Sequence, residues 1–553
     1  MSTTSKRLDA GNRLRSADAL AVIFGDQLIP PRDHPALRAI KKERDVVLMM
    51  EVDAEQQEGP SHKQRTALFL AAMRHYALDL IDLGYSVRYV RLDHPSNTQS
   101  FAGEVDRAVA ALTPRRIAAM HPGDWRVFEE IQRWERSIVE VKEVVVIEDP
   151  YFFTTPDAFA AWAKGRKSLT MEYFYREQRR ATGYLLDQNG DPLGGAWNHD
   201  KQNRLAFKDH PRPPGPPLFR IDCTTREVID LVSERFTDAP GKLDASSFTW
   251  PVTTEQGEQV LDRFVEECLE RFGPHEDAMW TEQPFLYHSM LSSSLNLHFL
   301  DPKRCCEKAI EAYERGRAPI NSVEGFVRQI LGWREYIRGV YWYEGAGYRD
   351  RNFLRSDGKL PGLYWDGQTD MRCLRECVSS VIDHAYAHHI PRLMVLANYA
   401  MIAGVSPRAI GDWFYGMFVD SVDWVTTPNT IGMGMHADGV RSADGSVESW
   451  PVVGTKPYAG GANYINKMSN YCAHCRYDHK SRRAETDLDR PPCPFNVFFW
   501  DFLIRHEDVF SKNHRMGMMM KNVAKMPSDE RVAITVTAKS YREKFGVSNR
   551  EDN

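Results

Sequence analysis

The sequence carries a spaced group of cysteines near its C-terminal end. Cys472 and Cys475 are separated by two residues, and Cys493 follows after seventeen more. Two thiolates at this spacing can hold one metal from a tight turn, and a third lies within reach of a loop. The fourth ligand must come from elsewhere, and Cys373 or Cys377 on an expected helix could supply it.

Two kinds of metal centre fit this cysteine pattern. Four thiolates around iron and sulfide would form a [4Fe-4S] cluster. The alternative is a tetrahedral structural zinc with His474 or His479 as a further ligand, and the spacing does not decide between the two. Because no apolar run is long enough for a membrane span or a signal sequence, we expect a cytoplasmic protein with reduced thiols and no disulfide framework.

A second group of chemically useful residues is rich in serine. It runs from His288 to Ser294 and includes Ser289, Leu291 and Ser292. Hydroxyls and backbone amides ahead of a helix suit a phosphate or pyrophosphate group. Serine also caps helices without binding any ligand, and composition alone favours that simpler interpretation.

A third group combines histidines with groups that can carry charge or electrons. His388 and His389 are adjacent, Arg392 follows, and Asp420 comes 28 residues after Arg392. A single histidine is most often a packed core residue, but an adjacent pair near an arginine is a candidate for proton transfer. The rings of Trp413 and Trp365 could be oxidised; packing is the commoner role of a helical tryptophan.

Composition limits what kind of protein positions these residues. The chain has 553 residues, which predicts three or four domains at roughly 150 residues each. Apolar residues make up 42% and charged residues 27%, which excludes a disordered or fibrous chain. The net charge of −5 excludes a generally basic nucleic-acid coat, although a local basic groove remains possible.

Residues 18–150 alternate between strand and helix patterns. This alternation predicts a parallel α/β sheet. Ligands of such sheets bind beyond the carboxyl ends of the strands, where Phe24, Asp26 and Glu51 are expected. The expected strands are Ala19–Phe24, Asp45–Met50, Gly84–Val90 and Val144–Ile147, with a helix over Lys63–Leu83.

The rest of the chain divides into a connector and a helical region. Residues 151–254 are expected to form an interdomain linker with some helices, and Asp187–Pro217 is too rich in Gly, Pro and Asn for regular structure. Residues 255–540 show helical spacing almost throughout, and residues 1–17 are an N-terminal extension of unassigned role. The expected helices here are Val260–Phe272, Lys303–Arg315, Val323–Trp342, Met371–His388, Leu393–Ala403 and Arg408–Phe418.

The order of these motifs resembles that of the photolyase/cryptochrome superfamily, in particular its bacterial iron–sulfur branch of prokaryotic (6-4) photolyases and related cryptochromes. The resemblance extends from Phe24 to Asn496. Its most specific stretches are Glu324–Tyr336, His388–Met394, Asp423–Val425 with Pro428 and Asn429, and Lys456–Tyr458 leading to the cysteine pair.

The resemblance implies a Rossmann-like α/β antenna domain, a long linker and a large all-α domain that binds FAD, with the iron–sulfur site between residues 373 and 493. The implied cofactors are FAD, a [4Fe-4S] cluster and a 6,7-dimethyl-8-ribityllumazine antenna. The cluster ligands fall on Cys373, Cys472, Cys475 and Cys493. The antenna site falls on Phe24, Asp26 and Glu51. The FAD positions are His288, Ser289, Leu291, Ser292, Arg334, Arg392, Asp420 and Thr426.

The implied reaction is light-driven DNA repair, in which reduced FAD donates an electron to a flipped (6-4) photoproduct. His388 and His389 are the implied proton donors, and Trp413 and Trp365 the implied electron route. Phe414 stands where some members have Tyr, and Thr426 where members of this branch often have Glu near flavin N5. Candidate phosphate contacts are Arg476, Lys480, Arg482, Arg483, Arg505, Lys512 and Arg515.

The expected partner is UV-damaged DNA, and we expect a monomer with no membrane association. A photosensory cryptochrome that signals without repair is the alternative, and a cyclobutane-dimer photolyase is a third. The presence of both His388 and His389 favours repair.

Overall fold

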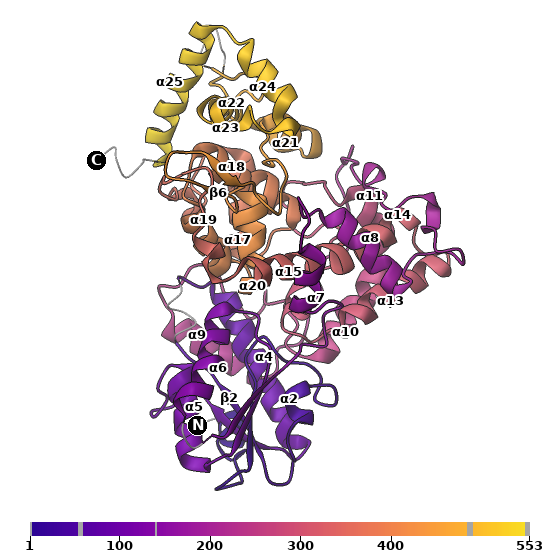
Figure 1. The fold of residues 1–553 in the computed structure, drawn as a ribbon, viewed down its shortest axis with the longest axis vertical. Helices are drawn as coiled ribbons and strands as arrows, with labels where there is room; N and C mark the ends of the chain where they lie inside the picture. The colour runs from indigo at the N-terminus through magenta and orange to yellow at the C-terminus, as the bar shows by residue number, and fades with distance from the viewer. Residues whose placement is uncertain (1–2, 54–58, 139–140, 484–489, 548–553) are drawn as a thin grey trace.

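The computed structural model describes residues 3–53, 59–138, 141–483 and 490–547. The expected ranges 1–17, 18–150 and 373–493 therefore each include some residues outside the described part. An α/β region lies at one end of the molecule, and helices form most of the remainder (Figure 1). Within the described residues, no helix combines the length and the apolar character that a membrane span requires.

Five parallel strands form one sheet in the order β3-β2-β1-β4-β5. The strands are β1 (Ala19–Val22), β2 (Val46–Met50), β3 (Ser86–Val90), β4 (Arg116–Met120) and β5 (Glu143–Ile147). The predicted α/β sheet and its four expected strands are thereby confirmed. The fifth strand, β4, is missing from the sequence-based expectation because Ile117 is its one β-branched residue and no apolar run extends it, unlike β1, which continues into Ile23 and Phe24. Pairing with β1 on one side and β5 on the other decides its conformation.

Helices cover the sheet and one of its edges. The helices of this region are α1 (Thr3–Asp9), α2 (Pro35–Arg38), α4 (Lys63–Asp82), α5 (Phe101–Leu112) and α6 (Trp125–Ser137). The backbone N–H of Val87 in edge strand β3 donates to the carbonyl of Gly11, at 3.0 Å. The described part of the N-terminal extension thus hydrogen-bonds to the backbone of edge strand β3, whose N–H and C=O groups would otherwise be unpaired on this side.

The segment expected to be a linker contributes packing to both regions. It contains α7 (Pro156–Ala163), α8 (Met171–Thr182), η1 (Leu193–Gly195), η2 (Asp200–Gln202) and α9 (Cys223–Arg235). Apart from η1 and η2, residues 187–217 form no helix or strand, as their composition predicts. Helix α9 returns to the α/β region, where Thr225 contacts His75 of α4 at 3.1 Å.

In the described part of the remaining chain the regular structure is helical apart from the short hairpin of β6 (Val440–Arg441) and β7 (Val447–Ser449). Its first half comprises α10 (Thr254–Arg263), η3 (Phe264–Cys268), α11 (Leu269–His275), α12 (Ser292–Asn296), α13 (Pro302–Glu314), α14 (Ile320–Val327), η4 (Arg328–Arg334), α15 (Glu335–Glu344), η5 (Ala346–Asp350), α16 (Leu363–Asp366) and α17 (Arg372–His384). Its second half comprises η6 (Pro391–Ala397), α18 (Asn398–Ala403), α19 (Pro407–Met417), α20 (Asp423–Thr427), η7 (Pro428–Gly434), α21 (Ala462–Met468), η8 (Tyr471–His474), α22 (Pro494–Arg505), α23 (Glu507–Phe510), η9 (His514–Met516), α24 (Gly517–Ala524) and α25 (Ser528–Phe545).

One expected helix is shorter than its apolar spacing predicts. The spacing extends to His388, but α17 ends at His384, and Ala385 takes a left-handed conformation with φ 52° as its cap. The chain therefore turns before the histidine pair, and the π-helical segment η6 begins directly after it. Segments with π-helical hydrogen bonding often occur at functional sites, and η6 carries Arg392.

Candidate functional site

The turn between α17 and η6 places two histidines in different environments. His388 is buried, whereas the side chain of His389 is 46% exposed. Burial and the nearby rings of His288 and His389 hold the pKa of His388 well below its usual value. His388 is therefore a neutral imidazole, and His389 is the member of the pair that a ligand can reach.

A short segment after α11 contacts these histidines and was not singled out from the sequence. Asp277 lies 3.6 Å from Nε2 of His389 and accepts a hydrogen bond from the hydroxyl of Tyr464 at 3.1 Å. Burial by itself raises the pKa of Asp277, but the bonds from His389 and Tyr464 outweigh burial and lower it. No local motif marks Asp277, because its partners are distant in the chain.

The neighbouring Glu276 is a buried carboxyl of a different kind. One of its oxygens, Oε2, has no hydrogen-bond partner among the described residues, and Arg328 is 4.0 Å from the other. Burial raises the pKa of Glu276 from 4.5 to about 7, against the opposing effects of His389 and Arg328. A carboxyl that can hold a proton near neutral pH thus lies beside the histidine site.

Arg392 and Asp420 form a bidentate ion pair with two N–H···O distances of 3.0 Å. Its connection to the histidines is short, because the backbone N–H of Arg392 donates to the carbonyl of His388 at 3.2 Å. The guanidinium also lies 4.2 Å from the ring centre of Phe418. A bidentate pair of this kind fixes the orientation of the carboxylate.

The serine-rich segment leads into α12, and the last residue of this helix contacts the same site. Asn296 of α12 donates to the backbone carbonyl of Asp420 at 2.7 Å. In the same helix the hydroxyls of Ser293 and Ser294 are buried without a hydrogen-bond partner among the described residues. Of the predicted positions, Ser289 accepts from the backbone of Leu291 at 3.4 Å, and Ser292 begins the helix. Unpartnered buried hydroxyls are what a polar cofactor would satisfy, so this segment fits FAD.

Trp413 is buried against the same group of rings. Its indole N–H donates to the carbonyl of Tyr364 at 3.0 Å, and the two rings meet edge to face with centres 5.1 Å apart. The ring of Phe418, which lies beneath Arg392, is 5.7 Å from Trp413. Trp365 follows Tyr364 in α16 and is 39% exposed, so the predicted electron route has one buried end and one end at the surface.

Two predicted flavin positions have their described contacts elsewhere. Arg334 donates to the carbonyl of Tyr151 at 2.9 Å, and its guanidinium lies 3.8 Å from the ring centre of Phe152. These contacts anchor the start of the linker segment. Thr426 is half-buried in α20, and its backbone N–H donates to Val422 at 3.0 Å. The structure thus gives Arg334 a packing role and leaves the roles of both residues toward a flavin as predictions.

Cys373, Cys472, Cys475 and Cys493 line one small cavity, whereas Cys377 does not. Cys373 comes from α17, Cys472 from η8, and Cys493 directly precedes α22. Burial raises the pKa of the Cys373 thiol, and the other thiols raise it further, so they are close enough to repel one another as anions. Four converging thiols suit a tetrahedral metal or a cubane cluster, and the set fits a [4Fe-4S] cluster.

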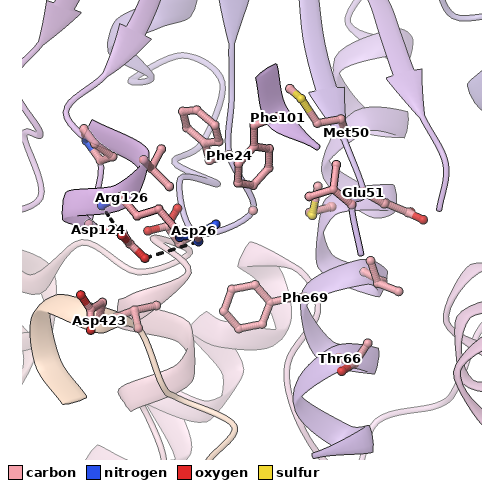
Figure 2. A pocket seen from close by; sticks show the side chains of 18 of the residues that line it. Phe24, Asp26, Met50, Glu51, Thr66, Phe69, Phe101, Asp124, Arg126 and Asp423 are labelled. Atoms are coloured by element: carbon pink, nitrogen blue, oxygen red, sulfur yellow. Dashed lines mark hydrogen bonds and ion pairs between the residues drawn. The ribbon is translucent and has the colours of Figure 1, made fainter. Parts of the chain in front are cut away.

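A larger pocket lies at the carboxyl ends of β1 and β2, with a volume of about 900 Å³ including its open mouth. Figure 2 shows that Phe24, Phe69 and Phe101 gather at its centre, while Asp26 and Arg126 lie to one side. Aromatic walls with polar groups at one side fit a flat heteroaromatic ring that bears a polar chain, as a ribityllumazine does.

Glu51 lines this pocket, yet both oxygens of its carboxylate already accept hydrogen bonds from other residues. Arg74 donates to both of its oxygens at 2.7 and 3.0 Å, the Tyr89 hydroxyl donates at 2.6 Å, and the N–H of Leu92 donates at 2.8 Å. In Figure 2 the carboxylate points away from the phenylalanine rings. The contribution of Glu51 that the structure describes is to hold β2 and α4 together as one wall of the pocket.

Several of the basic residues proposed for phosphate contacts are already paired. Arg476 lies 2.7 Å from Asp370, Arg505 lies 2.8 Å from Asp501, and Arg482 pairs with Glu530 at 2.5 Å. Arg505 also donates to a backbone carbonyl, which marks it as structural. A role of Arg476, Arg482 or Arg505 in binding a phosphate would have to compete with these contacts.

Comparison with known proteins identifies the family. A (6-4) photolyase of Agrobacterium fabrum is 43% identical over 527 residues, which cover 95% of this chain and 99% of that protein. The chain belongs to the photolyase/cryptochrome superfamily. A family model described as deoxyribodipyrimidine photo-lyase-related protein also matches residues 21–248.

Two further matches are a solved structure and an uncharacterised protein. A crystal structure of a bacterial class III photolyase from Agrobacterium tumefaciens aligns with a TM-score of 0.51 at 13% identity, covering 83% of this chain and 87% of that one. This likeness concerns the fold. An uncharacterised protein of Acanthamoeba polyphaga mimivirus is 28% identical over 111 residues, which are 20% of this chain and 84% of that protein.

Proposed function

We propose that this protein is a light-driven DNA photolyase that repairs (6-4) photoproducts. The observation that carries the proposal is the arrangement of His388, His389 and Asp277 directly beside the Arg392–Asp420 pair. It places a reachable proton donor next to the site where a flavin would bind. The named (6-4) photolyase that matches nearly the whole chain supports the same conclusion.

The residues around the ion pair would hold FAD. When bound, reduced FAD supplies the light-excited electron that splits the lesion. Asp420 is fixed as a charged acceptor by Arg392, and Asn296 holds the backbone of Asp420 in place. The unpartnered hydroxyls of Ser293 and Ser294 would donate to polar groups of the cofactor.

His389 would deliver the proton that oxygen transfer within a (6-4) lesion requires. Asp277 faces Nε2 of His389, and its lowered pKa keeps it charged, so it would fix the orientation of the imidazole. His388 is buried and neutral, and it would act as a hydrogen-bonding neighbour of the lesion. Flipping the damaged pair out of the helix costs a few kcal/mol, and a damaged pair costs least.

The other groups complete the proposal. Cys373, Cys472, Cys475 and Cys493 would hold a [4Fe-4S] cluster, and the pocket of Phe24 and Phe101 would hold a lumazine antenna. We infer a cytoplasmic monomer that binds UV-damaged DNA.

A repair assay tests the function directly. The reduced protein is illuminated with an oligonucleotide that contains one defined (6-4) lesion, and restored dinucleotide is measured by chromatography. We expect repair by the wild type and by His514→Ala, an exposed control. His389→Ala should lose about 10²–10⁴-fold in rate, because general acid catalysis contributes that much. Reduction of the flavin by light without any repair by the wild type would instead support a photosensory role.

The proposed electron route has a separate test. Replacing Trp413 by Phe removes the oxidisable ring but keeps its packing volume close to the original. We expect Trp413→Phe to retain its flavin, measured by absorbance after purification, while photoreduction of oxidised FAD slows by at least about tenfold. An unchanged photoreduction rate would exclude Trp413 as the electron donor nearest the flavin.

A further inference from the structure

Three imidazoles from two distant segments meet beside the proposed lesion site. His288 and His388 stack with ring centres 4.1 Å apart and an angle of 17° between the rings. His389 meets His288 and His388 edge to face at 5.6 and 5.8 Å. One nitrogen from each of the three rings lies within 4.8 Å of the other two.

A single stretch of chain orients all three rings. The backbone of Glu276 lies beside His288, and that of Ala278 beside His388. The residue between them, Asp277, faces Nε2 of His389 and is itself bonded to Tyr464. Histidines that ligate metals almost always donate their other N–H to a backbone carbonyl or a carboxylate, and the backbone of Glu276 and Ala278 and the carboxylate of Asp277 lie on the side where such partners are needed.

The other ring nitrogens of His288 and His388 make no hydrogen bond in the described structure. Nε2 of His288 and Nδ1 of His388 are buried, and neither has a hydrogen-bond partner among the described residues. Buried polar atoms are rarely left unpaired, and each such atom needs an explanation such as an ion or a water. A pair of unpartnered imidazole nitrogens beside a third imidazole is suited to bind a cation.

We propose that His288, His388 and His389 form a binding site for a divalent transition metal ion of the Zn²⁺ type. Imidazole suits zinc and its neighbours, whereas Mg²⁺ and Ca²⁺ prefer oxygen ligands. Three histidines leave one coordination position for water, which would lie on the exposed side of His389. Zn–N bonds of about 2.0–2.1 Å place tetrahedral ligand atoms roughly 3.4 Å apart, so the stacked rings close inward on binding.

This site has a consequence that rests on the proposed function. A bound metal takes the nitrogens of the same imidazoles that would hold and deliver the proton to a lesion. The metal-bound form and the repair-competent form therefore exclude one another. Zn²⁺ would act as a reversible inhibitor, and its removal by a chelator would restore the proton donor.

Binding is tested in the dark and without DNA, so that the result does not depend on repair. The purified protein with its natural cofactors is titrated with Zn²⁺ by calorimetry. We expect one site in the wild type and in His514→Ala, with affinity lowered at least tenfold in His288→Ala and in His389→Ala. Because His389 is half exposed, its variant should fold even where the variant of buried His288 does not.

Two further measurements separate this site from surface binding and from the cysteines. Asp277→Asn should lower Zn²⁺ affinity about 10–100-fold, since it removes the partner of one ligand and no ligand itself. Cu²⁺ added as a probe should give electron paramagnetic resonance couplings from several imidazole nitrogens, which disappear in His288→Ala or, if that variant does not fold, in His389→Ala. Equal Zn²⁺ affinity in the wild type and His389→Ala, or a wild type without a Zn²⁺ site, would overturn the proposal.

Discussion

Two buried glutamates, one in each region of the molecule, have opposite surroundings. Glu51 beside the sheet pocket accepts hydrogen bonds on both oxygens and is paired with buried Arg74. Glu276 beside the histidines keeps one oxygen without a partner among the described residues, and burial raises its pKa to about 7. The comparison distinguishes a polar group that completes the fold from one that is left available for chemistry.

The same difference in hydrogen bonding distinguishes the wall of the sheet pocket at Glu51 from the surroundings of Glu276 at the histidine site. The carboxylate of Glu51 has all of its polar interactions before any ligand arrives, so this wall of the pocket is preformed. Around Glu276 the unpartnered atoms belong to several residues, and a ligand, proton or ion would satisfy them. Substitution of Glu51 should therefore lower the stability of the protein, whereas substitution of Glu276 should change how that stability depends on pH.

The largest expected effect concerns two cysteines one helical turn apart on α17. Cys373 faces the cavity of the other three thiols, whereas Cys377 bonds to Tyr471. We expect Cys373→Ala to lose essentially all bound iron and Cys377→Ala to keep it, measured by metal analysis and by absorbance near the iron–sulfur shoulder. Equal iron content in the two variants would remove Cys373 from the ligand set, and one zinc without iron would replace the cluster by a zinc site.

The Glu51 wall should show a large effect on stability alone. Glu51→Ala leaves the Arg74 guanidinium charged and unpaired in the interior, which costs about 3–5 kcal/mol in unfolding free energy. Denaturant unfolding measures this loss. The control is Asp33→Ala, which breaks an exposed pair with Arg38 and should change stability by about 0–1 kcal/mol. A cost for Glu51→Ala no larger than that of the control would contradict the comparison.

Glu276 should show the smallest effect, and only as a dependence on pH. Because its pKa rises from 4.5 to about 7 on folding, the folded state binds the proton more tightly. Its stabilising contribution is complete below about pH 4.5 and is lost as pH rises through about 7. Glu276→Gln does not titrate, so its stability relative to wild type should increase by about 1–3 kcal/mol between pH 5 and pH 8. Parallel stability curves for the two proteins would show that Glu276 is ionised in the folded state.

Much of the α/β region follows from local sequence. β2, β3 and β5 are rich in β-branched or long apolar residues, β1 continues into Ile23 and Phe24, and each strand lies within or close to its predicted range. β4 is missed by local prediction because Ile117 is its one β-branched residue and no apolar run extends it, so its neighbours in the sheet decide its conformation. Helix α17 ends four residues before its apolar spacing does, because the chain turns at Ala385.

The candidate site likewise has features that the local sequence indicates and features that it does not. Residue type and spacing alone indicate the cysteine pattern and the adjacent histidines His388 and His389. Spacing does not distinguish Cys373 from Cys377 as a ligand, since residues four apart share one face of a helix. The family resemblance favours Cys373. The ligand set is a prediction that a measurement of iron content tests.

The sequence by itself determined the parallel sheet, the helical character of the larger region and the residues able to carry metal, proton and electron chemistry. These properties depend on side-chain type and on periodicity along one segment. Only the tertiary structure decided that His288 stacks on His388, that Asp277 faces His389 and that Glu51 is bonded on both oxygens. Each of these depends on packing between segments far apart in the chain, where no local preference acts.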